Sequence, residues 1–61
     1  MNENEKPFQI RTIPVADIDG KLQSVFVRGL DSESEADLSV AARNIAAFDL
    51  GIDARYEVVT L

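Results

Sequence analysis

The chain of 61 residues contains eleven acidic and six basic residues, which give a formal charge of -5 at pH 7, and it has neither cysteine nor histidine. A chain of this length forms one small domain with a limited core. Because thiols and imidazoles are missing, a disulfide framework and the usual zinc sites are excluded. Self-association is the remaining common way to stabilise so small a domain.

The distribution of charge opposes direct binding to nucleic acid. The basic residues stand singly along the chain, whereas four acids fall between Asp31 and Asp37. A surface without a basic patch repels phosphate. No apolar run approaches the roughly 20 residues that span a bilayer, and the N-terminus lacks the basic and apolar regions of a signal peptide. We therefore expect a cytoplasmic protein that binds neither nucleic acid nor membrane.

The first half of the chain predicts a β-hairpin. Residues 1–6 are polar and are predicted to be a mobile tail, which leaves residues 7–61 as a single domain. The runs 8–15 and 22–30 are rich in aromatic and β-branched residues, which are typical of strands. Their pattern of apolar residues predicts the hairpin's two strands.

The turn between these strands sets their register. Asp17-Ile18-Asp19-Gly20 suits a type I turn with a left-handed glycine and a G1 bulge, which pairs Asp17 with Lys21. A two-residue type I′ turn at Asp19-Gly20 is the alternative, but it would require a ladder hydrogen bond that Pro14 cannot donate. The bulged register makes both faces apolar, with Ile13, Val15, Val25 and Val27 on one and Phe8, Ile10, Leu22, Phe26 and Leu30 on the other.

The segment Asp31 to Ile52 predicts one amphipathic helix. Ser32 and Glu35 form the sequence pattern of a capping box, and Gly51 supplies a left-handed residue that ends the helix. Large apolar residues recur at helical spacing, and we expect this stripe to pack on the sheet, with Ile45 meeting Phe26 in the core. The stripe consists of Leu38, Ala41, Ile45 and Phe48.

A third strand over 55–61 completes a ββαβ chain, so the predicted fold is α+β: a three-stranded sheet with one α-helix packed on one face. Pro14 argues for an edge position of the first strand, which makes the second strand, 22–30, the central one. The alternative places the third strand beside the first, which gives an all-antiparallel sheet with a proline in its central strand.

The helix carries the residues predicted to meet a partner. Acids in its first turns complement the helix dipole, but four of them without an interspersed base also suit a basic partner. The side opposite the apolar stripe has small and apolar residues where lysine and glutamate are usual, which predicts contact there as well. Asp49, at the negative end of the dipole, is expected to pair with Arg43 or Arg55 or to contact a partner. The candidate interface consists of Glu33, Glu35, Ala36, Asp37, Val40, Arg43 and Ala47.

The sequence contains no pattern that predicts catalysis. It lacks a phosphate loop, a nucleophile with a paired base and a histidine, so we expect no catalytic, cofactor-binding or metal-binding residues. Asp17-Ile18-Asp19-Gly20 resembles the opening of a calcium loop, but a strand follows it where a calcium loop requires further ligands and a helix. A hairpin turn is the better interpretation.

Two apolar sheet faces and one helix leave one face uncovered, which predicts a protein partner or a second copy of the chain. The layout resembles that of small phage-encoded proteins that inhibit host machinery, through Glu35-Ala36 at the helix start and Tyr56-Glu57-Val58 in the last strand. That resemblance implies an inhibitor or adaptor that docks on a larger host protein, such as a basic surface of a nucleic-acid enzyme. The alternative is a structural or regulatory homodimer without a foreign partner.

Overall fold

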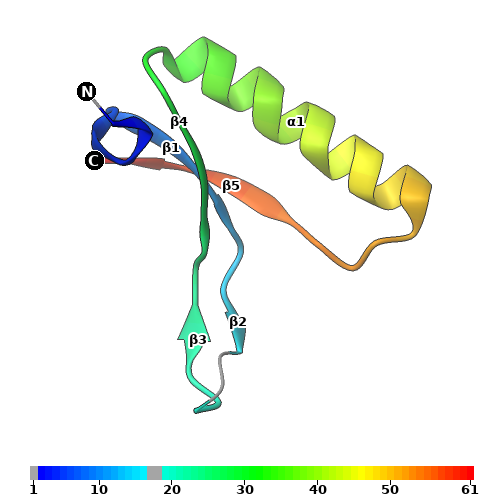
Figure 1. The fold of residues 1–61 in the computed structure, drawn as a ribbon. Helices are drawn as coiled ribbons and strands as arrows, with labels where there is room; N and C mark the ends of the chain where they lie inside the picture. The colour runs from blue at the N-terminus through cyan, green and yellow to red at the C-terminus, as the bar shows by residue number, and fades with distance from the viewer. Residues whose placement is uncertain (1, 17–18) are drawn as a thin grey trace.

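The computed structural model describes residues 2–16 and 19–61 and confirms the predicted α+β class, with one helix packed on a three-stranded sheet (Figure 1). The molecule is flat, with a smallest dimension of 15 Å, as expected for two layers. In chain order the elements are η1 (Glu3–Glu5, a 3-10 helix), β1 (Phe8–Thr12), β2 (Val15–Ala16), β3 (Leu22–Gln23), β4 (Phe26–Leu30), α1 (Glu33–Leu50) and β5 (Tyr56–Thr60).

The sheet has the order β4-β1-β5, and both strand pairs are antiparallel. The prediction that the second strand is central is therefore wrong, and the all-antiparallel alternative is correct. Pro14 does not oppose this order, because β1 ends at Thr12 and the proline lies in the connection to β2. The central strand keeps its ladder donors, and Ile10, in its middle, is fully buried beneath the helix layer.

The long hairpin is split into two sheets. Val27 has no partner in β1, since Ile10 pairs with Arg28 and the next residue, Arg11, pairs with Phe26. Because of this β-bulge, Phe26 lies on the sheet face opposite to that of Ile10. The prediction that Phe26 and Ile10 share one face is therefore wrong. Beyond it, β2 and β3 form a separate arm that projects away from the helix (Figure 1).

The arm preserves the register that the bulged turn predicts. Val15 pairs with Gln23 and Ala16 with Leu22, and Gly20 has a φ of 81°, in the left-handed region. The predicted pairing of Asp17 with Lys21 continues this register, but residues 17 and 18 lie outside the described residues. A two-stranded ribbon without a covered face is marginally stable by itself.

The ends of α1 are those predicted from the sequence. The Ser32 hydroxyl accepts a hydrogen bond from the Glu35 amide at 3.5 Å, which satisfies one free donor of the first turn. At the other end Gly51 has a φ of 70°, and two further bonds close a Schellman motif: Gly51 N–H to Phe48 O, and Ile52 N–H to Ala47 O. Local sequence therefore determines where the helix starts and stops.

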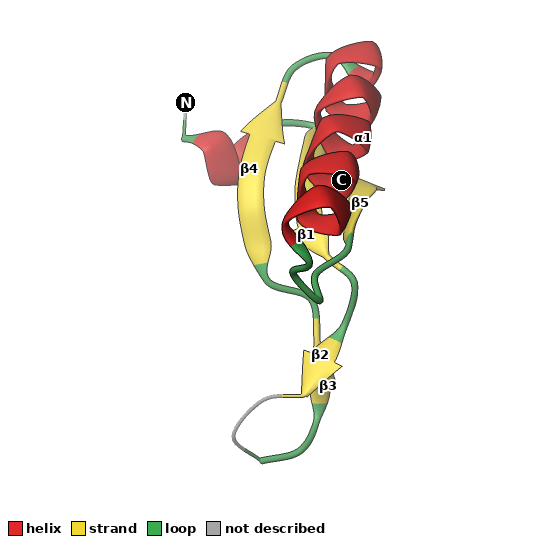
Figure 2. Cartoon of the chain, turned by 90° about the vertical axis from the view of Figure 1, so that its right-hand side faces the viewer, coloured by secondary structure: helices red, strands yellow, loops and turns green. Residues whose placement is uncertain are grey.

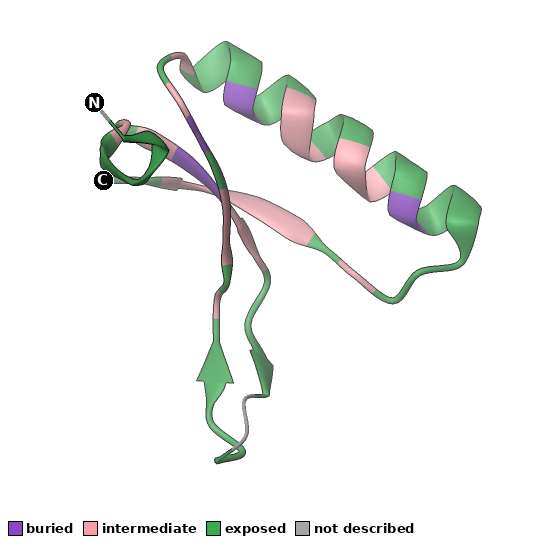
Figure 3. Ribbon diagram, in the orientation of Figure 1, coloured by how far each residue is buried: buried purple, intermediate pink, exposed green. Residues whose placement is uncertain are grey.

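The face that α1 turns to the sheet is the opposite of the predicted one. Ala36 and Ala47 are 0% and 5% exposed, and Figure 3 shows the buried and half-buried residues of α1 along the side that faces the sheet. Leu38, Ile45 and Phe48 are exposed instead, so the predicted contact between Ile45 and Phe26 does not form. Small side chains let the helix lie close to the sheet, where residues such as Ile10 supply the bulk.

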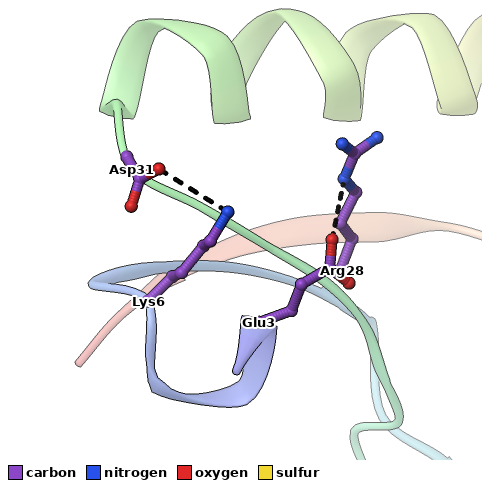
Figure 4. A network of polar contacts seen from close by, with 4 residues as sticks. All are labelled: Glu3, Lys6, Arg28 and Asp31. Carbon is purple, nitrogen blue, oxygen red and sulfur yellow. Dashed lines mark ion pairs between the residues drawn. The ribbon is translucent and has the colours of Figure 1, made fainter. Parts of the chain in front are cut away.

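In the N-terminal segment, which is predicted to be a mobile tail, residues 3–5 form η1, and η1 contacts β4. Figure 2 shows η1 and α1 on opposite sides of this strand. Two ion pairs hold the segment: Lys6 Nζ lies 3.5 Å from an Asp31 carboxylate oxygen, and Arg28 Nε lies 3.4 Å from a Glu3 carboxylate oxygen (Figure 4). Both pairs are largely solvated and contribute little individually.

Gly29 allows this contact because it has no side chain. A Cβ built there would lie 1.8 Å from the Glu3 carbonyl oxygen, far inside van der Waals contact. We expect Gly29→Ala to displace η1 and to lower the free energy of unfolding by about 1–3 kcal/mol, as overpacking does. Urea denaturation measures this change.

A matched experiment separates the clash from a general effect of alanine in the strand. In a chain that lacks residues 1–5, Gly29→Ala should cost little or even stabilise, because the clashing backbone is gone and alanine restricts the unfolded chain. An equal loss of stability in the long and short chains would contradict the proposed contact between η1 and β4.

Candidate partner-binding surface

The outward side of α1 presents a row of apolar side chains to solvent. Leu38, Ile45 and Phe48 are 72%, 62% and 77% exposed, and Ala41 lies between them in the same phase. We call these four residues the outer row. Their spacings of three, four and three residues are those of the a and d positions of a coiled coil. A stripe of this kind is normally buried, so its exposure marks a candidate binding surface.

The whole chain is consistent with an uncovered surface. Its accessible area is 4423 Å², whereas a compact protein of this mass exposes about 3,900 Å². Among the described residues, Ile10 is the only large side chain that is fully buried, and several large apolar residues of the arm and of α1 stay exposed. The chain therefore buries little apolar surface by itself.

Acidic side chains lie beside the outer row and at the start of α1. Glu33, Glu35, Asp37 and Asp49 are all exposed, and none forms an ion pair with another described residue. The expected pairing of Asp49 with Arg43 or Arg55 is thus not formed. The only basic residue of α1, Arg43, lies on the sheet-facing side, so all charged residues on the outward side of the helix are acidic.

Arg43 is held by the sheet. Its guanidinium carbon lies 5.9 Å from the centroid of the Tyr56 ring, within the range of a cation–π contact. Its Nε is buried and has no hydrogen-bond partner among the described residues, while the residue as a whole is half-buried. The basic charge is consequently unable to neutralise the acids on the opposite side of the helix.

Asn44 fixes the orientation of α1 on the sheet. Its side-chain oxygen accepts from Tyr56 N–H at 2.9 Å, and its side-chain nitrogen donates to Tyr56 C=O at 3.3 Å. These backbone groups point away from β1, because the preceding residue, Arg55, accepts the inward bond from Ile13 N–H. One amide thus satisfies both outward groups of Tyr56 at the open edge of β5 and fixes the rotation of the helix on the sheet, in which the outer row stays exposed.

The structure separates the seven predicted interface residues into two groups. Glu33, Glu35 and Asp37 are exposed on α1 and remain available to a partner. The other four lie on the sheet-facing side, which removes them from the outward surface: Ala36, Val40, Arg43 and Ala47. Sequence reasoning placed the outer row in the core because large apolar residues usually pack there. The signal it missed was Asn44, a polar residue at the border of the small-residue face that hydrogen-bonds to Tyr56 at the edge of the sheet.

The described residues also contain a pocket away from the outer row. A pocket of about 250 Å³ lies where β1 ends, lined by Thr12, Ile13, Pro14, Val15, Asp53, Ala54 and Arg55. The described residues contain no group of three or more metal-ligating side chains. Within the same residues, no helix has the length and apolar character needed to cross a membrane.

Comparison with known proteins adds no assignment: no family model, no curated protein and no solved structure matches the chain.

The two faces of α1 give opposite predictions for substitution. Ala36→Leu places three additional carbon atoms in a fully buried position and should lower the free energy of unfolding by about 1–3 kcal/mol. Ile45→Gln, on the outer row, should change it by less than about 0.5 kcal/mol, because the side chain is already in water. Thermal or urea unfolding of the two variants decides which face packs on the sheet, and a larger loss for Ile45→Gln would reverse the assignment.

Removal of the Asn44 amide tests how α1 is held. Alanine is a better helix former than asparagine, so propensity alone predicts that Asn44→Ala stabilises the protein. We expect destabilisation of about 1–3 kcal/mol instead, because the variant leaves two Tyr56 backbone groups without partners. Ser34→Ala, at an exposed position of the same helix, is the control for propensity in urea denaturation. Stability equal to that of the control would show that water replaces the amide at no cost.

Proposed function

We propose that this protein is a small interaction module that binds a protein partner through the outward side of α1. The observation that carries the proposal is the outer row, three large apolar side chains more than 60% exposed, bordered by Glu35, Asp37 and Asp49, which form no ion pair with any described residue. Burial of such side chains at an interface contributes roughly 1.5–3 kcal/mol each before the costs of association. The row supplies the affinity in this proposal.

The acids supply selectivity. Carboxylates around an apolar patch favour partners that place lysine or arginine opposite them, and they raise the association rate at low salt. They also oppose nonspecific contacts with nucleic acid and with other acidic proteins. A basic region of a larger protein is thus the complementary surface. The inhibitor or adaptor role that the layout resemblance implies is one use of such docking and stays a prediction.

A second candidate function is assembly into a homodimer, and the open edge of β5 favours it. Asn44 covers the outward backbone groups of Tyr56, but by the alternation of the ladder the next outward groups belong to Val58 and Thr60. Such an unpaired edge can pair with another strand. The accumulated negative charge of -5 per chain opposes self-association, which places this function second.

Three variants of α1 test the proposed surface. Ile45→Gln with Phe48→Gln should abolish capture of the partner from an extract of the source organism. Leu50→Gln should leave capture unchanged, because Leu50 is equally exposed, at 73%, but lies outside the outer row. Asp37→Asn with Asp49→Asn should weaken capture and reduce its dependence on salt.

The same proteins are compared by sedimentation and circular dichroism. All of them should remain folded, since the altered side chains are exposed. Capture that is equal for the outer-row variant and the Leu50 variant would refute the proposed surface. A parent protein that sediments as a dimer, and an outer-row variant that sediments as a monomer, would support the homodimer instead.

A further inference from the structure

We infer that the partner segment bound by the outer row is a basic amphipathic α-helix, paired with α1 as in a short coiled coil. The inference rests on the proposed function and specifies the partner. Leu38 and Ile45 take the a positions, and Ala41 and Phe48 the d positions, of two consecutive heptads. An extended peptide repeats every second residue and does not match this spacing.

The form of α1 suits a helical partner. The helix is 18 residues long, capped at both ends and fixed to the sheet by the Asn44 contacts with Tyr56, so it is already ordered before binding. Only the partner pays the entropy of helix formation. Ala41, between Leu38 and Ile45, also leaves room for a larger residue of the facing helix.

The flanking positions predict the charge of the partner. In the heptad, Glu35 and Asp49 occupy e positions and Asp37 a g position, where coiled coils place the charges that select a partner. All three side chains are exposed acids. A helix with lysine or arginine at its own e and g positions therefore complements α1, whether it runs parallel or antiparallel.

A second copy of α1 does not complement the first. In an antiparallel pair centred on the outer row, the e positions face each other, so Glu35 of each copy lies opposite Asp49 of the other. In a parallel pair, Asp37 faces Ala42 and Asn44 faces Asp49, and the acidic first turns lie together at one end. Neither arrangement forms an ion pair of opposite charges, which is why a basic helix is the better occupant.

Synthetic peptides test this inference. Three peptides of about three heptads share the same apolar a and d residues. The first carries lysine at e and g, the second carries glutamate there, and the third has the residues of the first with a central proline that breaks the helix. Binding to the full chain is followed by calorimetry, and the helicity of the peptide by circular dichroism.

The basic peptide should bind at least about tenfold more tightly than the acidic one, gain helicity on binding and lose affinity as salt rises. The proline peptide should not bind. Ile45→Gln with Phe48→Gln should remove binding of the basic peptide, whereas Leu50→Gln should retain it.

Three results would overturn the inference. Equal binding of the proline peptide would mean that the outer row accepts an extended segment, and no binding in a monomeric protein would mean that it is not a helix-pairing surface. A stable dimer that excludes the peptide would identify a second copy as the occupant. The first two results would not contradict the proposed function, because the capture experiment tests binding of the partner whatever the partner's conformation.

Discussion

The structure depends on the close approach of a small-residue helix face to the sheet. Ala36 and Ala47 are buried there, near opposite ends of α1, and between them Asn44 forms two hydrogen bonds with Tyr56 at the edge of β5. Alanine provides little apolar area, so this interface contributes less hydrophobic stabilisation than a row of leucines would. The paired hydrogen bonds offset part of that deficit, because unpaired backbone groups would be costly in any other orientation of the helix.

This arrangement leaves the larger apolar side chains of α1 in water. One side of α1 packs on the sheet through Ala36 and Ala47, and Leu38 and Phe48 remain exposed. A domain of this size has a thin margin of stability. The exposed apolar stripe is the feature on which the proposed partner binding rests. The same orientation places Arg43 against the Tyr56 ring and leaves Glu35, Asp37 and Asp49 exposed, so the packing of one helix face gives the other face both its apolar and its acidic character.

Part of the candidate surface could be predicted from the sequence. The acids Glu33, Glu35 and Asp37 follow the N-cap Ser32, where carboxylates complement the positive end of the helix dipole. The outer row was equally visible as a periodic pattern, but the sequence did not show whether it faces the sheet or solvent. On a helix with apolar residues on both sides, periodicity identifies two faces that could pack on the sheet. The size of the side chains favours the outer row, but the hydrogen bonds of Asn44 with Tyr56, which only the fold reveals, favour the other face.

The sequence by itself determined the class of fold, the ends of α1 and the register of the arm, because each depends on residues close together in the chain. A serine cap, a left-handed glycine and a turn sequence act locally, whatever the rest of the molecule does. Only the tertiary structure decided the central strand, the contact of η1 with Gly29 and the face of α1 that packs. Those choices depend on contacts between distant residues, such as Glu3 with Gly29 and Asn44 with Tyr56, and the geometry that brings such groups together exists only in the folded chain.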